Sequence, residues 1–399
     1  MSIFTTNLIL KGYNKIMKKS KFYTNRKYYS KQDLINDFGD NAKVKTIWNE
    51  VEEYRKIYSY TLPAAYNSSK KLFIVQTPVI LQKEINLLNK VNNFYRIFIN
   101  AIGEKYNTKI INEEIQNLGF FEDLKYVAKN RMNIDVPNFT IENIIFDGFI
   151  GEEENEIATQ KIYNLMKVFA IKYEGLNYLT KELFPNIITK DKINLIDTNI
   201  NNAIEYENLN SYVTKSAIIY FIIWQQIKDE KYDIITMLLI QSYLFKTSFS
   251  ALVSTARFSA LFNSWISRFE EACTNVEKYS GDITYLYLIF MEFFQELVQH
   301  TTYETINFTN DKNLSNVVIT RRTKNLDFNK LLKMFPDLSA KQARFYVQHK
   351  TKGAYYTVND FKTKMQTSYE TARYSMEKLE DLGLYEKRKI GKKYVYKAK

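Results

Sequence analysis

Apolar side chains recur at helical spacing through most of the chain. One stripe ends at Gly103 and consists of Leu87, Leu88, Val91, Phe94, Phe98 and Ile102. A second stripe consists of Leu209, Val213, Ser216, Tyr220 and Trp224. Residues three and four positions apart share a helix face, so each stripe predicts a helix with one buried side. No proline occurs between Pro185 and Pro336, and 251–273 and 283–301 are two further helix candidates.

The C-terminal end of the chain shows a different pattern, of short helices. The segment Leu338–Val347 has apolar residues one or two turns apart and predicts a first helix. Thr357 and Asp360 form a variant of the capping box and predict a second helix, which runs to about Met365. A third helix is predicted from about Ser368.

The third of these helices precedes a pair of strands. Its inward stripe consists of Ala372, Met376, Leu379 and Leu382. Gly383 supplies the left-handed residue that ends a helix, and the strands Leu384–Ile390 and Lys392–Tyr396 flank Gly391 as a basic hairpin. Two helices, a turn, a third helix and a hairpin predict a small winged helix-turn-helix of α+β type.

A winged helix places the start of its third helix in the major groove of DNA and its hairpin against neighbouring phosphates. The predicted groove contacts are Ser368, Tyr369, Thr371, Arg373 and Tyr374. The predicted hairpin contacts are Lys387, Arg388, Lys389, Lys392 and Lys393. Winged helices also serve as protein-docking or purely structural modules, and this alternative stays open.

Charge is divided unevenly along the chain. The total is +12, from 56 basic and 44 acidic residues. Residues 1–32 carry eight basic residues and no acid, and 338–399 carry twelve Lys and three Arg against six acids. Basic ends are typical of contact with phosphate, although a genome biased towards Lys would give the same surface. We expect 1–32 to be a mobile basic arm that contacts nucleic acid or acidic partners.

Composition places the chain among globular proteins, with 45% apolar and 25% charged residues. The longest uncharged apolar stretch, Ala217–Trp224, is far shorter than a membrane span. Met1–Leu10 lacks the features of a secretory signal, and the single Cys273 excludes an internal disulfide. We therefore expect a cytoplasmic protein without a membrane partner.

Several segments resemble the Fic (Fido) family of bacterial proteins. Ser368–Arg373, Leu379–Leu384 and Gly391–Tyr396 resemble the winged helix that ends many Fic-domain proteins. A second set of residues resembles the N-terminal part of those proteins: Trp48, Arg55, Leu62, Pro63, Thr77 and Pro78. Met237–Leu244 resembles the helix that follows their active-site loop.

The resemblance implies a mainly α fold that is divided into four parts. Residues 1–32 form the basic arm and 33–135 an N-terminal helical region. Residues 136–325 form a Fic-like helical domain with a degenerate catalytic loop, and 326–399 form the winged helix-turn-helix domain.

Fic enzymes transfer a nucleotide monophosphate, usually AMP, to a hydroxyl group of a target protein, through a loop of pattern H-P-F-x-D/E-G-N-G-R-x-x-R. Its histidine is the general base, its acid holds the metal, its glycines cradle phosphate and its arginines neutralise phosphate charge. The alignment puts Gln226 at the histidine, Ile227 and Lys228 at Pro-Phe, Glu230 at the acid, Lys231, Tyr232, Asp233 and Ile234 at Gly-Asn-Gly-Arg, and Met237 at the second arginine. Of these positions only the acid is retained.

The loss of the catalytic loop does not depend on this register. The chain has two histidines, His300 and His349, and both lie far downstream of the loop. No glycine occurs between Gly175 and Gly281, so a glycine-dependent phosphate cradle is excluded there. The family's inhibitory glutamate is also replaced, since Ile150 stands at its position in the segment Phe146–Gly151.

Other enzyme classes find little support. Metal clusters require several His or Cys residues at set spacings, which one Cys and two His do not provide. A nucleophile pair of Cys273 and His300 on neighbouring helices is conceivable, but a buried thiol is far more common. We expect no metal and no cofactor.

The sequence therefore predicts a catalytically degenerate Fic-family protein that binds DNA through its winged helix, as a transcriptional regulator and homodimer. One alternative is a divergent Fic nucleotidyltransferase that retains nucleotide binding through Glu230 and Lys228 or Lys231. Another is a protein-interaction module whose winged helix docks a protein partner.

Overall fold

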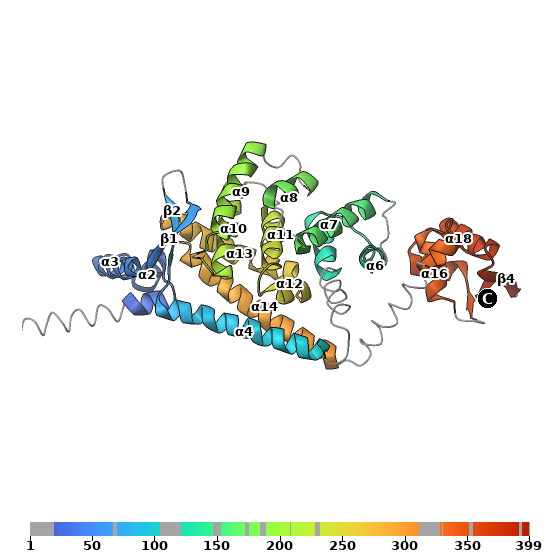
Figure 1. Ribbon diagram of the computed structural model, residues 1–399, viewed down its shortest axis with the longest axis horizontal. Helices are drawn as coiled ribbons and strands as arrows, with labels where there is room; N and C mark the ends of the chain where they lie inside the picture. The colour runs from blue at the N-terminus through green and yellow to red at the C-terminus, as the bar shows by residue number, and fades with distance from the viewer. Residues whose placement is uncertain are drawn as a thin grey trace, which may run out of the picture. The chain divides into compact units, whose positions relative to one another are not determined.

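A computed structural model describes residues 20–66, 70–103, 121–146, 153–171, 175–183, 189–207, 209–227, 232–310, 328, 330–350, 354–390 and 393–398. Its described part is mainly helical with two small antiparallel sheets, which confirms the predicted fold class (Figure 1). Contacts divide the chain into two compact units. One combines the described parts of 1–100 and 165–303, and the other combines those of 101–164 and 304–399.

The N-terminal elements are α2 (Lys31–Phe38), α3 (Ala42–Ile57), β1 (Ser59–Ala65), β2 (Lys71–Val75) and α4 (Pro78–Gly103). The central elements are the π-helix η1 (Val127–Arg131), α6 (Asn138–Phe146), α7 (Glu154–Ile171), α8 (Gly175–Leu183), α9 (Lys190–Ile204), α10 (Tyr212–Gln226), α11 (Tyr232–Leu244), α12 (Ser250–Thr255), α13 (Phe258–Lys278) and α14 (Thr284–Asn310). The C-terminal elements are α16 (Ala340–Gln348), β3 (Tyr355–Tyr356), α17 (Val358–Met365), α18 (Tyr369–Asp381), β4 (Tyr385–Ile390) and β5 (Lys393–Ala398).

The first unit is built around α10 and α11, which pack against each other. Both helices are apolar on all sides and almost fully buried, as expected for central helices of a bundle. Rings from α10, α13 and α14 meet beside them, and Phe269 stacks on Phe290 with ring centroids 4.5 Å apart. The first apolar stripe of the sequence lies in α4. The second lies in α10 except for Leu209, which precedes the helix, and α10 is buried on nearly all sides and not on one side as predicted.

One predicted helix is divided in two. The expectation of a continuous helix over 251–273 is wrong, because α12 ends at Thr255 and α13 begins at Phe258. Ala256 between them is extended, with φ −80° and ψ 154°. The break contains no proline and no glycine, so residue type alone did not indicate it.

A β-hairpin that the hydrophobic pattern did not predict lies near the N-terminus. Strands β1 and β2 pair antiparallel, and the turn between α13 and α14 extends the edge of β2. Phe73 donates its N–H to the carbonyl of Gly281 (3.0 Å) and accepts from the N–H of Ile283 (2.9 Å). Gly281 has φ +94°, and a Cβ there would lie 3.1 Å from the ring of Tyr66, so this close turn requires glycine.

The predicted mobile arm is wrong for residues 20–32, which pack on the first unit. Tyr23 and Tyr28 are buried, and the Tyr28 hydroxyl donates to Asp282 Oδ2 over 2.6 Å. The backbone N–H of Lys31 donates to the Tyr279 hydroxyl at 2.9 Å, and Ser30 caps α2 through a capping box. The remainder of the predicted arm, 1–19, lies outside the described residues.

A buried arginine joins this N-terminal segment to the helices. The Arg55 guanidinium of α3 lies 3.5 Å from the centre of the Tyr28 ring. It donates hydrogen bonds to the carbonyls of Tyr29 (2.7 Å) and Tyr23 (3.3 Å) and to the Tyr285 hydroxyl (3.1 Å). Burial raises the pKa of the neighbouring Asp282 carboxyl, and the charge of Arg55 opposes that rise. One charged pair therefore connects three segments that are far apart in sequence.

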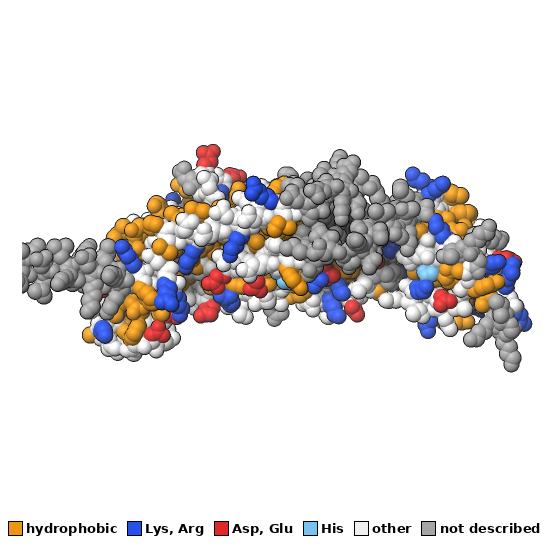
Figure 2. Space-filling model, turned by 90° about the horizontal axis from the view of Figure 1, so that it is seen from below, with side chains coloured by type: hydrophobic (Ala, Val, Ile, Leu, Met, Phe, Trp, Pro, Cys, Tyr) orange, Lys and Arg blue, Asp and Glu red, His pale blue; other side chains and the backbone are white. Residues whose placement is uncertain are grey.

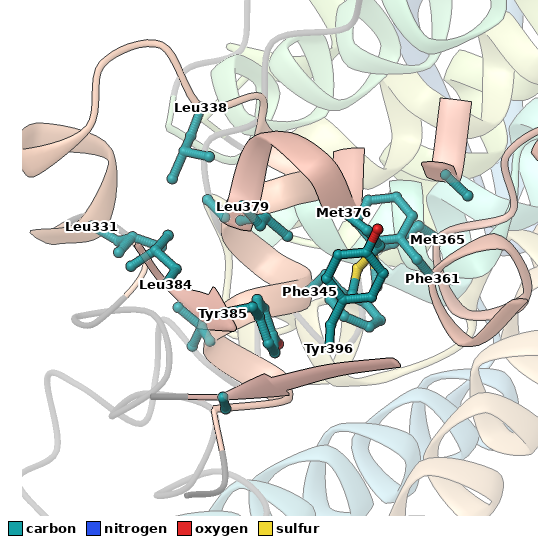
Figure 3. Close-up of a cluster of buried hydrophobic side chains, with 14 of the residues drawn as sticks. Leu331, Leu338, Phe345, Phe361, Met365, Met376, Leu379, Leu384, Tyr385 and Tyr396 are labelled. Atoms are coloured by element: carbon teal, nitrogen blue, oxygen red, sulfur yellow. The ribbon is translucent and has the colours of Figure 1, made fainter. Parts of the chain in front are cut away.

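The C-terminal elements from α16 to β5 enclose a hydrophobic cluster of their own, called here the C-terminal module (Figure 3). Its sheet has the strand order β3-β5-β4, with both pairs antiparallel. Thr357 and Asp360 form the predicted capping box of α17, and Ser368 caps α18. Gly383 has φ +73°, as predicted for the residue that ends the third helix.

Candidate functional site

The start of α18 presents polar and aromatic side chains to solvent. Ser368 and Thr371 are exposed there, Tyr369 is 48% exposed and Tyr374 is 65% exposed. The opposite face of the helix buries Ala372, Met376 and Leu379 in the module's core, as predicted. The five predicted groove residues are therefore brought together at one end of one helix.

Three of these residues already make contacts within the helix. The Ser368 hydroxyl accepts the backbone N–H of Thr371 at 3.1 Å and lies 2.9 Å from the Thr371 hydroxyl. Arg373 pairs with Glu370 over 2.9 Å, and both side chains are more than half exposed. An exposed pair of this kind contributes roughly 0–1 kcal/mol, so Arg373 can exchange the carboxylate for a phosphate at little cost.

The hairpin carries its cations on both faces of the sheet. Lys387 and Lys389 are two positions apart in β4 and lie near the ring of Tyr394, at 5.1 and 6.0 Å from its centre. Arg388 alternates to the opposite face, where it pairs with Glu386 at 2.9 Å. Lys387 also approaches Glu377 of α18 at 3.6 Å. The described hairpin cations therefore form two groups, Lys387 and Lys389 on one face and Arg388 on the other. The prediction from the sequence placed them in one group.

The other two predicted hairpin residues are less completely described. Lys392 lies outside the described residues, and only the backbone of Lys393 is described, as the first residue of β5. Within the described part of the module, Lys and Arg side chains are scattered among hydrophobic groups on the face shown in Figure 2.

Exposed tyrosines on the sheet are candidates that the sequence reasoning missed. Tyr394 is 56% exposed and Tyr355 is 47% exposed. Lys397 lies 6.0 Å from the centre of the Tyr355 ring. The sequence reasoning assigned the aromatic stripes to the core. Strand alternation gives no signal for Tyr394, because Tyr396 lies on the same face of β5 and is buried.

The segment aligned with the Fic loop connects α10 to α11. Gln226 is the last residue of α10, Tyr232 is the first of α11, and Ile234 is buried. Residues 227–231 lie between the two helices, whereas the aligned Gln226 belongs to α10 and Tyr232, Asp233, Ile234 and Met237 belong to α11. Lys228, Glu230 and Lys231 lie outside the described residues, as does most of the segment Phe146–Gly151.

Tyr232 binds to the neighbouring helix. Its hydroxyl donates to the carboxylate of Glu270 on α13 and lies 3.5 Å from the hydroxyl of Tyr220. Burial, reinforced by Glu270, raises the pKa of Tyr232 well above its usual value. The side chain therefore fixes the start of α11 to α13.

The remaining candidate nucleophile is inaccessible. Cys273 is completely buried, and burial raises the pKa of its thiol well above the usual value. The thiolate is the reactive form, so this environment disfavours nucleophilic chemistry. His300 is exposed on α14. The described residues contain no group of three or more His, Cys, Asp or Glu that could hold a metal ion.

In the described part of the chain, no helix combines the length and the apolar character needed to cross a membrane.

No family model matches the chain, and no curated protein matches it. Among solved structures, the chain is similar to the crystal structure of a Fic family protein from Desulfovibrio desulfuricans G20. The two share 11% sequence identity with a TM-score of 0.42, over 85% of this chain and 98% of that chain. A likeness at this level supports no statement about activity or site residues.

Proposed function

We propose that the C-terminal module is a winged helix that binds duplex DNA, and that the protein acts as a transcriptional regulator. The observation that carries this proposal is the exposed start of α18. Tyr369, Arg373 and Tyr374 face solvent there, while the other face of the helix packs in the core of the module. A helix supported in this way can enter the major groove with its N-terminal residues towards the base edges.

The order of elements supports the same proposal. Helices α17 and α18 are joined by a short turn in which Gln366 is left-handed, with φ +47°. The hairpin of β4 and β5 follows α18 and pairs with β3. A hairpin beside a recognition helix reaches the phosphates that flank the groove.

Electrostatics add the sequence-independent part of the affinity. Residues 338–399 carry a net charge of +9. Each cation placed on a phosphate releases condensed counterions, so the logarithm of the binding constant falls steeply with salt. The ion pairs of Arg373 and Arg388 are exposed and therefore compete weakly with this exchange.

We expect Arg373→Ala and Lys389→Ala each to weaken DNA binding of the full chain by roughly threefold to tenfold at moderate salt. Each variant should also lower the slope of log K against log salt by about 0.9. Fluorescence anisotropy of a labelled random-sequence duplex, titrated at several salt concentrations, measures both quantities.

Lys333→Ala is the matched control, because Lys333 is exposed in the same unit but lies outside the α18 and hairpin surface. It should bind as the unaltered chain does. Equal affinity for all four proteins, or binding that does not respond to salt, contradicts the proposal. Capture of one stoichiometric protein partner that survives nuclease treatment, without any DNA binding, favours protein docking instead.

We further propose that the chain has no Fic-type transferase activity. No histidine precedes the loop segment or lies near it, and no glycine occurs between Gly175 and Gly281. Loss of the base and of the phosphate cradle removes the proton acceptor and the preorganised donors together. The hydrogen bond from the Tyr232 hydroxyl to Glu270 also supports the absence of transferase activity, since it fixes the start of α11 to α13.

Incubation of the purified chain with labelled ATP and a cell lysate should therefore label no protein. Autoradiography of the separated lysate measures the result. A labelled band that depends on the chain and disappears in Glu230→Ala would restore the enzyme alternative, because Glu230 is the aligned acidic residue.

A further inference from the structure

Helix α4 runs along one edge of the first unit (Figure 1) and carries a second apolar stripe outside the core. The core side of α4 consists of Ile80, Glu84, Leu87, Val91, Phe94 and Phe98, which are all buried. The second stripe, called here the α4 seam, consists of Leu81, Ile85, Leu88, Asn92 and Tyr95. Ile85 is 50% exposed, Tyr95 is 47% exposed and Leu81 is 38% exposed. Asn92 is exposed and Leu88 is partly buried, so the seam presents large apolar side chains to solvent.

The spacing of the α4 seam is that of a coiled-coil helix. Its five residues are four, three, four and three positions apart, which is the heptad spacing of residues that pack against a partner helix. Each residue of an α-helix turns the chain by about 100°, so the centre of the seam lies about 100° around α4 from the centre of its core side. A surface helix needs one apolar stripe to pack on its own core. The second stripe therefore has the pattern of a contact with another helix, and exposed apolar patches of this kind mark interaction sites.

Charged side chains of α4 lie mostly away from the seam. Lys83 and Lys90 fall on roughly the opposite side of the helix, and Glu84 is buried on the core side. Among the described side chains of α4, Arg96 is the charged one that borders the seam. The whole chain carries a net charge of +12, so a contact between two copies is favoured where cations are sparse. An uncharged seam suits an apolar helix better than nucleic acid or an acidic segment.

The order of residue types within the seam favours a second copy of the same helix. Ile85 and Asn92 occupy the a positions of the heptad, and Leu81, Leu88 and Tyr95 occupy the d positions. A β-branched residue at a with leucine at d favours two parallel helices. An asparagine at a fixes the register, because its amide both donates and accepts and can pair with the same amide of an identical helix. In an antiparallel pair centred on Leu88, Asn92 would face Ile85 and its amide would lack this partner.

We propose that the α4 seam packs against the same seam of a second copy of the chain, in a parallel homodimer with two-fold symmetry. In this homodimer, Ile85 and Asn92 each face the same residue of the other copy. The pairing does not depend on DNA binding by the C-terminal module, since the seam lies wholly in the first unit.

Sedimentation equilibrium of the full chain without DNA tests this pairing. The seam is about 20 Å long. It is smaller than an interface of standard size, which buries about 800 Å² per partner, so we expect a reversible dimer with a Kd on the order of 10 µM. The mean mass should rise from 47.3 kDa towards twice that value as the protein concentration increases from roughly 1 to 200 µM.

Ile85→Glu and Ile85→Lys should each weaken dimerisation at least about tenfold, because like charges would then face each other across the two-fold axis. An equimolar mixture of the two variants should recover dimerisation, because opposite charges then face each other. Ile85 is 50% exposed, so both variants should keep the circular dichroism spectrum and the melting temperature of the unaltered chain.

Val79→Glu is the matched control, since Val79 is 45% exposed on roughly the opposite side of α4 and should leave dimerisation unchanged. A mass that stays at 47.3 kDa up to the highest concentration overturns the proposal. Equal dimerisation by Ile85→Glu and Val79→Glu also overturns it, because the dimer would then form through another surface. A mixture of the two Ile85 variants that does not recover dimerisation does the same, because position 85 would then not face its own copy.

Discussion

We expect Arg55→Met to lower the free energy of unfolding by about 3–5 kcal/mol at pH 7. Methionine keeps much of the volume of the arginine stem, so the loss comes from charge and hydrogen bonds more than from a cavity. The substitution leaves Asp282 buried at 3% exposure without its cation. It also leaves the carbonyls of Tyr23 and Tyr29 without their arginine donor. Urea unfolding followed by circular dichroism measures the loss.

The loss should shrink as the pH falls. Burial already raises the pKa of Asp282 above the ordinary value of 3.8 for an aspartate, and removal of Arg55 removes the opposing charge. Between 3.8 and the raised value, the folded state binds a proton that the unfolded chain does not. Stability therefore increases as pH decreases through that window. The difference between Arg55→Met and the unaltered chain should be largest at neutral pH and smaller near pH 4.

Two further variants separate charge burial from a general loss of packing. Arg96→Met changes an exposed arginine of α4 and should alter stability by no more than about 0.5 kcal/mol. Adding Asp282→Asn to Arg55→Met should recover about 1–2 kcal/mol, since the unpaired buried charge is removed. A double variant as unstable as the sum of the two single variants contradicts the explanation by charge.

The contrast between this cluster and the helices shows what the sequence could reveal. The capping box of α17 was predicted because a cap is a local signal, contained in residues three positions apart. The stripes of α4 and α10 were predicted because helix periodicity is also local. Tyr28 and Asp282 are separated by 254 positions, and no spacing rule relates residues that far apart.

The same limit explains the error in the N-terminal segment. Four basic residues lie between Lys21 and Lys31 without any acid, and charge dominated the prediction of an arm. Those cations point away from the core, whereas Tyr23 and Tyr28 of the same segment are buried. Lys and Arg can lay their aliphatic stems along an apolar surface while their charged groups stay in water. A basic segment can therefore still be part of a folded unit.

Strand β1 was missed for a related reason. It contains Pro63 and pairs with a single partner, so its ladder is short and its alternation is weak. The turn at Gly281 completes its small sheet from the other end of the unit, which again requires a contact distant in sequence. For the candidate DNA-binding surface, the sequence correctly gathered the residues of α18. The prediction treated Lys387, Arg388 and Lys389 as one group, although the two-residue alternation of the predicted strand already separates Arg388 from the two lysines.

The other large effect is expected in the core of the C-terminal module. Phe361 is completely buried, and its ring centre lies 4.7 Å from that of Phe345 (Figure 3). Truncation of a buried phenylalanine to alanine removes about 3–5 kcal/mol. A core that serves only about 70 residues rarely supplies more than about 3–5 kcal/mol in total. We therefore expect Phe361→Ala to unfold the module.

DNA binding should then be lost because α18 is held by the same core, and not because Phe361 touches DNA. Limited proteolysis should cleave Phe361→Ala between residues 340 and 398, where the unaltered chain resists, and anisotropy should show no binding. Tyr374→Ala is the matched control, since its ring is 65% exposed on α18. It should resist proteolysis as the unaltered chain does while it weakens DNA binding. If Phe361→Ala were cleaved in this region and still bound DNA with unchanged affinity, the folded module could not be the surface that DNA contacts.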